Sequence, residues 1–169
     1  MTTLQSLSSL DRDAFIAALD GIFEHSPWVA DAAWEKRPFG SFEALRDALL
    51  CAMREAGHAR QLALVRAHPE LAGRASVRGE LTAESSREQA GARLDACTPD
   101  EFARLQSLNS AYNAKFGFPF IMAVRGHDRQ QIIERFSQRL ANAPEVEFVE
   151  ALRQIERIAT LRLTDLVQG

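Results

Sequence analysis

Apolar residues recur three and four positions apart along most of the chain, so the pattern predicts helices joined by short polar loops. Leu10, Phe15, Leu19 and Ile22 would form one apolar face of a helix over residues 11–24. Another helix should begin near residue 26, and further helices are predicted over 41–57, 58–68, 98–117, 128–141 and 144–168. The predicted fold class is therefore all-α, a compact bundle of several helices.

One stretch, residues 118–124, has the composition of a strand. It contains Pro119, and the sequence holds no second stretch of similar quality with which it could pair. We therefore expect an apolar connecting segment here, and not a sheet.

Residues typical of helix ends support several of these boundaries. Ser26 followed by Pro27 suits the start of a helix. Thr98 and Glu101 have the spacing of a capping box, with proline at the first helical position between them. Gly117 follows the last apolar residue of that helix and should end it.

Length and composition favour one globular domain. The 169 residues are 46% hydrophobic and 25% charged, as in ordinary globular proteins. No internal repeat or low-complexity linker divides the chain, so residues 1–169 are predicted to form a single domain. The formal net charge of −3 argues against nucleic acid or an anionic membrane as a partner, and makes a helix-turn-helix DNA-binding protein a poor interpretation.

The two cysteines and the chain ends bear on the compartment. Cys51 and Cys97 lie far apart without the spacing of a metal site, so neither a disulfide framework nor a zinc site is expected. A reducing cytoplasm is the default interpretation. The first residues lack the features of a signal peptide, the last residues are no peroxisomal signal, and no apolar run reaches the roughly 18 residues of a membrane span.

The stretch RAHPELAG, residues 66–73, is the first candidate for chemistry. Pro69 disfavours a helical conformation for the residue before it, so His68 should end a helix. An imidazole at that end lies near the negative pole of the helix dipole, which favours its protonated form, and could donate or relay a proton near neutral pH. The alternative is a histidine that only bonds the last carbonyls of the helix.

The stretch SSREQAG, residues 85–91, allows two interpretations. Ser85 and Glu88 match a capping box, in which case both only begin a helix. If Thr82 is the N-cap instead, Ser85 and Glu88 lie one turn apart on one face, with Gln89 beside them. A hydroxyl, a carboxylate and an amide would then converge on a small polar ligand.

The stretch FGFPFIMAVRG, residues 116–126, combines a helix break at Gly117 and Pro119 with an apolar sequence. Backbone N–H groups in such a segment need hydrogen-bond partners, and they could bind a carboxylate or carbonyl of a ligand. A buried loop that caps the next helix would also account for the sequence.

Arg162 lies inside the apolar stripe of the last predicted helix, seven residues after Ile155 and four before Leu166. A guanidinium there needs an anionic partner, because an unpaired buried charge is costly. A structural ion pair with a carboxylate in the core is the commoner explanation for such a residue.

Taken together, HPELAG, LTAESSREQAG, FGFPFIMAVRG and IERIATLRLTDL, with SPWVADAAW nearer the N-terminus, resemble the 2-oxo-4-hydroxy-4-carboxy-5-ureidoimidazoline (OHCU) decarboxylase family. The resemblance covers nearly the whole chain, and the ordered set of the three central motifs is specific. It implies a helical bundle that converts OHCU to (S)-allantoin and carbon dioxide, the last step from urate to allantoin in purine catabolism. It also implies a cytoplasmic, typically homodimeric enzyme that needs no metal or organic cofactor.

The resemblance also implies roles for individual residues. His68 matches the catalytic histidine, and Glu88 and Arg162 are further catalytic positions, while Arg125 flanks the site. The residues expected to bind substrate are Pro69, Ser85, Ser86, Arg87, Glu88, Gln89, Phe120, Ile121, Met122, Ala123 and Val124. The alternative is a non-enzymatic helical binding or scaffold module. It would not explain why His68, Glu88 and Arg162 occur in apolar or irregular segments of the chain.

Overall fold

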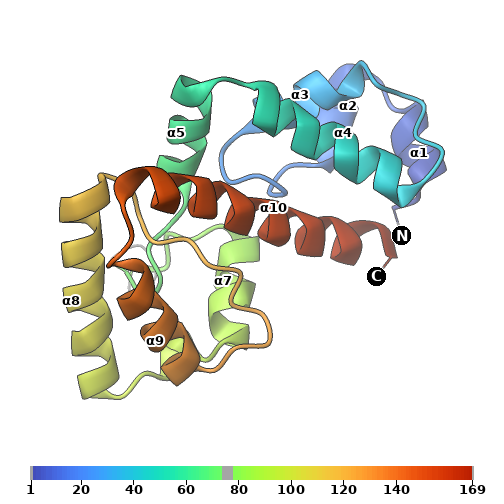
Figure 1. Cartoon of the computed structure of the whole chain (residues 1–169). Helices are drawn as coiled ribbons and strands as arrows, with labels where there is room; N and C mark the ends of the chain where they lie inside the picture. Colours follow the sequence, from blue (N-terminus) through green and yellow to red (C-terminus); the bar gives the residue numbers. More distant parts are fainter. Residues whose placement is uncertain (1, 74–77, 169) are drawn as a thin grey trace. The chain divides into compact units, whose positions relative to one another are not determined.

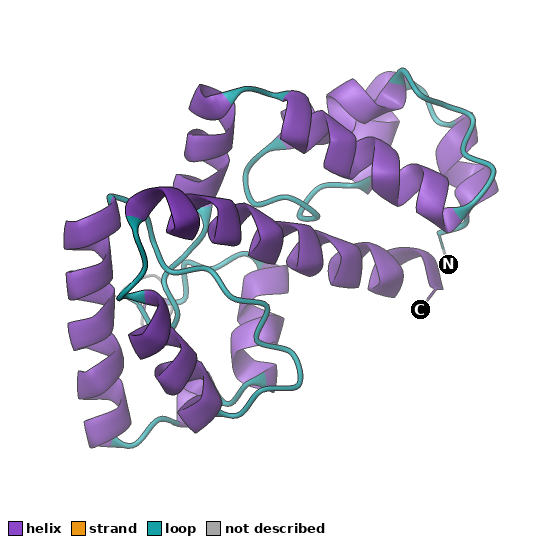
Figure 2. Cartoon of the chain, viewed as in Figure 1, coloured by secondary structure: helices purple, strands orange, loops and turns teal. Residues whose placement is uncertain are grey.

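The computed structural model describes residues 2–73 and 78–168, and these residues form helices and loops without a strand (Figure 2). The prediction of an all-α fold is confirmed. The helices, labelled in Figure 1, are α1 (Leu4–Ser9), α2 (Arg12–Ala18), α3 (Pro27–Trp34), α4 (Phe42–Glu55), α5 (His58–Ala67), α7 (Ala83–Gly91), the 3₁₀ turn η1 (Leu94–Ala96), α8 (Pro99–Phe116), α9 (Arg129–Arg139) and α10 (Pro144–Gln168).

Local signals placed most helix ends correctly. The capping box of Thr98 and Glu101 is formed at the start of α8, and Gly117 ends that helix with a φ of 73°. The helix predicted over 11–24 is shorter, because α2 ends at Ala18 and the following turns contain positive φ angles at Gly21 and His25. α1 was not predicted.

The described chain forms two compact units. The first contains the chain up to Leu64 and the chain from Glu156 onward, and the second is Val65–Ile155. The extent of the domain, predicted as residues 1–169, stays a prediction. None of the helices in the described part of the chain is long and apolar enough to cross a membrane.

In the first unit, α3 packs against both α2 and α4 (Figure 1). Phe15, Val29 and Leu45, one from each of these helices, are fully buried in its core. The guanidinium of Arg54 on α4 binds both carboxylate oxygens of Glu156 at 2.7 and 2.8 Å, which ties α4 to the C-terminal part of α10.

The second unit is built around aromatic rings. α8 packs against α9 (Figure 1), and Tyr112 of α8 lies edge-on to the ring of Phe136 of α9, with ring centroids 5.6 Å apart. Phe120, from the segment between these helices, stacks on Phe136 at 3.9 Å. This core holds the apolar connecting segment 118–124 in place.

Candidate active site

His68 directly follows the last residue of α5, as the proline after it predicted. Its side chain is buried, with 7% of its surface exposed, and its backbone N–H donates to the carbonyl of Val65 at 3.3 Å. Pro69 thus ends the helix at a point where the imidazole is inside the second unit and not on its surface.

Side-chain amides hold the turn that follows His68. The three successive carbonyls of residues 70–72 accept hydrogen bonds from Gln89 (3.2 Å), Asn109 (3.0 Å) and Gln106 (2.7 Å), in that order. The oxygen of the Gln89 amide also accepts from the backbone N–H of Ala72 at 3.0 Å. We call these three side chains the amide clamp.

The clamped turn has a strained backbone. Ala72 adopts a φ of 49°, a left-handed conformation that costs a residue with a Cβ about 1–2 kcal/mol. Gly73 is needed beside it, because a Cβ at that position would lie 2.5 Å from the Cβ of Glu70. The hydrogen bonds of the clamp therefore stabilise a conformation that the sequence of the turn would not favour alone.

The start of α7 decides between the two interpretations of its sequence. Thr82 is the N-cap and accepts a hydrogen bond from the N–H of Ser85 at 3.3 Å, so Ser85 is not the cap. Ser85 and Gln89 lie one turn apart and are both buried, and Glu88 beside them is half-buried. Thr82 is therefore the N-cap, and the convergence of the Ser85 hydroxyl, the Glu88 carboxylate and the Gln89 amide on a ligand stays a prediction.

Two other residues of this predicted binding stretch face outward. Ser86 and Arg87 are exposed, and the guanidinium of Arg87 binds Glu84 at 2.9 Å and the carbonyl of Ala83 at 3.2 Å. The structure thus separates the predicted stretch into a buried side and an exposed side.

The segment 118–124 is irregular, and protein side chains bind its backbone. The carbonyl of Ile121 accepts a hydrogen bond from Arg139 at 2.6 Å, and the N–H of Ala123 donates to Gln154 at 3.0 Å. The guanidinium of Arg139 also lies over the ring of Phe120, 4.4 Å from its centroid. The Ala123 amide is therefore already bonded within the protein, and Arg125 beyond the segment is exposed.

A buried carboxylate anchors this arrangement. Glu147 is fully buried and accepts hydrogen bonds from Tyr112 (2.5 Å), Arg139 (2.7 Å) and Asn142 (2.9 Å). Burial, and then the hydrogen bond to Glu147, raise the pKa of the Tyr112 hydroxyl well above its ordinary value. This network was not predicted from the sequence, although Glu147 lies in the apolar stripe of α10, eight residues before the buried Ile155.

Hydrogen bonds bring the three predicted segments of the second unit together. Arg66, two residues before His68, donates to the carbonyl of Gly117 at 3.1 Å, directly before the apolar segment. Asn113 of α8 donates to the carboxylate of Glu70 at 2.5 Å. Because Gln89 joins α7 to the same turn, the motifs HPELAG, SSREQAG and FGFPFIMAV are neighbours in the fold.

Arg162 belongs to the first unit, where it has the anionic partner that its burial requires. Its guanidinium donates to the carboxylate of Glu24 at 2.9 Å and to the carbonyl of Gly21 at 2.8 Å. Only 5% of Arg162 and 1% of Glu24 is exposed. The structural ion pair considered from the sequence is therefore present, although its carboxylate lies 138 positions away.

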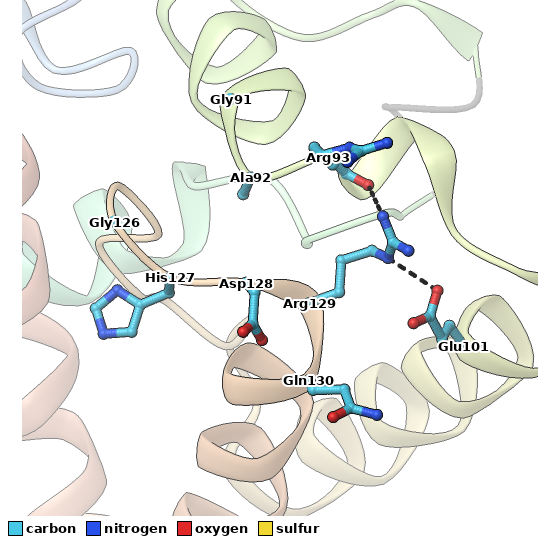
Figure 3. A pocket seen from close by; sticks show the side chains of 9 residues that line it. All are labelled: Gly91, Ala92, Arg93, Glu101, Gly126, His127, Asp128, Arg129 and Gln130. Carbon is cyan, nitrogen blue, oxygen red and sulfur yellow. Dashed lines mark hydrogen bonds and ion pairs between the residues drawn. The ribbon is translucent and has the colours of Figure 1, made fainter.

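An open surface cleft of about 580 Å³ lies beside the ends of two predicted segments. Figure 3 shows Arg129 between Arg93 and Glu101, with an ion pair to Glu101 (2.9 Å), a hydrogen bond to the Arg93 carbonyl (3.3 Å), and His127 pointing away. None of the residues that line the cleft is among the predicted catalytic or substrate-binding residues; they are Gly91, Ala92, Arg93, Glu101, Gly126, His127, Asp128, Arg129 and Gln130. Within the described ranges, no group of three or more His, Cys, Asp or Glu side chains could hold a metal ion.

Comparisons with known proteins agree with the motifs. Residues 8–164 match the family model described as OHCU decarboxylase. The chain is 41% identical to the 2-oxo-4-hydroxy-4-carboxy-5-ureidoimidazoline decarboxylase of Haloferax volcanii, over 96% of this chain and 95% of the relative. It is 39% identical to the mouse protein of the same name, over 95% and 90%. A crystal structure of (S)-allantoin synthase is similar over 98% of this chain, with a TM-score of 0.79 and 29% identity, and the chain spans 54% of that protein.

Proposed function

The chain belongs to the OHCU decarboxylase family, and from this premise we propose how its residues carry out the reaction. The reaction is the decarboxylation of OHCU to allantoin in urate degradation, which makes the protein a carboxy-lyase. The observation on which the residue roles rest is the clamped turn, where buried His68 follows α5 and Gln89 joins the turn to α7.

Decarboxylation of OHCU breaks the bond between a ring carbon and its carboxylate, and carbon dioxide leaves without the bonding electrons. The electron pair moves into the ring imine of the substrate, so we propose that no metal or organic cofactor is required. The former imine nitrogen takes up a proton, and a second proton is added to one face of the carbon that carries the ureido group. The ring hydroxyl loses its proton and becomes the carbonyl of (S)-allantoin. The protein must therefore orient the carboxylate, protect the intermediate and deliver a proton to one face.

We assign the proton chemistry to His68 and Glu88, which would engage the hydroxyl and carboxylate region of the substrate. A histidine suits this task because its pKa ordinarily lies near neutral pH. Ser85, Glu88 and Gln89 would bind the ureido and ring N–H groups, and the burial of Ser85 and Gln89 on one side of α7 supports this role. Pro69 would turn the imidazole toward the bound substrate. Because both ends of the Gln89 amide bond the turn, its role includes holding that turn.

The apolar segment would hold the ring or ureido oxygens through backbone N–H groups. Since the N–H of Ala123 donates to Gln154, we assign this contact to the neighbouring amides and give Ala123 a place in the wall of the site. The side chains of Phe120, Ile121, Met122 and Val124 are buried and would shield the intermediate from water. Ser86 and Arg87, which are exposed, would contribute only as neighbours of the binding side of α7.

For Arg162 we propose that its guanidinium neutralises or orients substrate charge, as the family resemblance implies. Its bonds to Glu24 and to the carbonyl of Gly21 would fix the direction of the guanidinium group.

We also propose that the enzyme is cytoplasmic and homodimeric. The free thiols of Cys51 and Cys97 suit a reducing compartment. Val146 and Val149, one turn apart on α10, are 57% and 47% exposed, and association of two copies would remove apolar surface of this kind from water. Sedimentation equilibrium should give twice the mass of the chain, and the mass of a monomer at micromolar concentration would contradict the proposal.

The proposed reaction can be tested directly. OHCU is unstable, so it is generated in place from urate with urate oxidase and hydroxyisourate hydrolase. Circular dichroism then follows the product after this protein is added. Rapid appearance of one enantiomer, (S)-allantoin, is the expected result, and slow racemic decay at the uncatalysed rate would refute the assignment.

The role of His68 is tested with His68→Asn, which keeps a polar side chain at the end of α5. We expect this variant to lose turnover by at least about 100-fold, the contribution of a positioned acid or base, while its far-ultraviolet circular dichroism stays unchanged. Turnover within a factor of two of the unmodified enzyme would show that His68 is not the catalytic residue.

A further inference from the structure

The amide clamp places three donors against three successive carbonyls of one turn. Two of them, Gln106 and Asn109, lie three residues apart on one face of α8 and belong to the same stripe as Asn113, which binds the carboxylate of Glu70. Gln89 approaches the turn from α7. The conformation of residues 70–72 is thus fixed by two helices that are far from it in sequence.

Burial explains why the turn needs these partners. Leu71 and Ala72 are 7% and 3% exposed, so their carbonyls cannot rely on bulk water for hydrogen bonds. Amide side chains satisfy the carbonyls without carrying a charge. They therefore define the position of the turn and add no charged group to the surroundings of His68.

Asn109 differs from the other members of the clamp because only one of the two polar atoms of its side-chain amide has a hydrogen-bond partner among the described residues. It is 3% exposed, and its Nδ2 atom donates to the carbonyl of Leu71 at 3.0 Å. Its Oδ1 atom is buried and has no hydrogen-bond partner among the described residues. A fully buried asparagine that leaves one polar atom unsatisfied is poorly explained by stability alone.

We propose that Asn109 is a positioning residue of the decarboxylase, which fixes the orientation of His68 through the carbonyl of Leu71, with Gln106 and Gln89 as its partners. The proposal rests on the role of His68 in the proposed function. Asn109 need not touch the substrate, because a displaced turn would move the imidazole away from the geometry that proton transfer requires.

The test is Asn109→Leu, which keeps the approximate volume but removes the donor. The substitution removes the unsatisfied Oδ1 atom but also leaves the buried Leu71 carbonyl without its donor, so the melting temperature should fall modestly while the protein stays folded at the assay temperature. The kcat for OHCU should fall about 10- to 100-fold, as expected for a misplaced catalytic group, while KM changes less than about twofold. Gln61→Met is the matched control, because Gln61 is also an amide side chain that donates to two backbone carbonyls, those of Met53 and Arg54 in the first unit. Its kcat should stay unchanged.

A second measurement separates a positioning role from general destabilisation. In protein labelled with ¹⁵N-histidine, the four histidine rings are resolved by NMR, and the His68 signal is the one missing from His68→Asn. In Asn109→Leu the His68 signals should shift or broaden, while those of His25, His58 and His127 remain. Unchanged His68 signals, or a kcat equal to that of the unmodified enzyme, would overturn the proposal. If Asn109→Leu alters the His68 signals but the unmodified protein does not form allantoin, the structural role of the clamp is supported and the proposed function is refuted.

Discussion

From the burial of the ion pair between Arg139 and Glu147, we predict how much its removal lowers the free energy of unfolding. The substitution Arg139→Met keeps the length of the side chain but removes its charge and its hydrogen bonds. Glu147, fully buried, would keep only the neutral donors of Tyr112 and Asn142. The carbonyl of Ile121 would lose its partner as well.

The magnitude follows from burial. Breaking one side of a buried ion pair costs about 3–5 kcal/mol, since the remaining charge is desolvated without compensation. We expect a loss in this range, a large part of the roughly 5–15 kcal/mol that stabilises a typical domain. With a urea dependence of about 2 kcal/mol per molar, the unfolding midpoint should fall by about 2 M.

Two further variants test whether the loss of stability comes from a buried charge left without a partner. Arg54→Met removes an ion pair of similar geometry, but 60% of the Arg54 side chain is exposed, compared with 12% for Arg139, so its loss should be only about 0–1 kcal/mol. The double variant Arg139→Met with Glu147→Gln should recover more than half of the lost stability, because no charge is then buried without a partner.

The assay is urea unfolding followed by far-ultraviolet circular dichroism, which reports the helices of both units. Fluorescence of Trp28 and Trp34, which both lie in the first unit, gives an independent transition. If Arg139→Met lowers the free energy of unfolding by less than about 1 kcal/mol, the carboxylate of Glu147 does not depend on Arg139, and the reasoning from burial is wrong.

Two further predictions concern local structure. Gly73→Ala should destabilise the protein by about 1–3 kcal/mol in thermal unfolding and lower kcat, because its Cβ would meet Glu70 at 2.5 Å; Gly40→Ala, with nothing within 4 Å, is the control and should be near neutral. A hydrogen bond from the Thr98 backbone lowers the pKa of Glu101, so this carboxylate stabilises the fold above its ordinary pKa and the contribution is lost as pH falls through the lowered value. Glu101→Gln should therefore melt at a lower temperature than the unmodified protein at pH 7 but not at pH 2, and an equal difference at both pH values would contradict this.

The parts of the fold that the sequence predicted are those with a local cause. The cap of α8 involves Thr98 and Glu101, only three residues apart, and the end of α5 depends on the single bond between His68 and Pro69. Such signals can be read without the rest of the structure. The prediction for 11–24 was wrong beyond Ala18, since the apolar residues that follow occupy the core from turns and not from a helix.

The site was predicted as a set of motifs, but not the contacts that shape it. Asn109 lies 38 residues from the carbonyl that it binds, and Gln154 lies 31 residues from the Ala123 amide. In a helix, asparagine and glutamine resemble ordinary surface residues, and no spacing marks them as partners of a distant turn. The pairing of Arg162 was foreseen in kind because a buried charge needs a counter-charge, whereas the identity of Glu24 required the fold.

The chain contains one tyrosine, so its ionisation can be followed by absorbance without interference from a second tyrosine. Tyr112 is the single tyrosine, and its hydroxyl is enclosed in the second unit against Glu147. At a pH above the ordinary pKa of tyrosine, an opened chain forms tyrosinate, which absorbs at longer wavelength than the neutral phenol. The folded chain retains the proton, because burial and Glu147 raise the pKa of this group. The rate at which tyrosinate absorbance develops after a jump to high pH would therefore time the opening of the second unit, without any label.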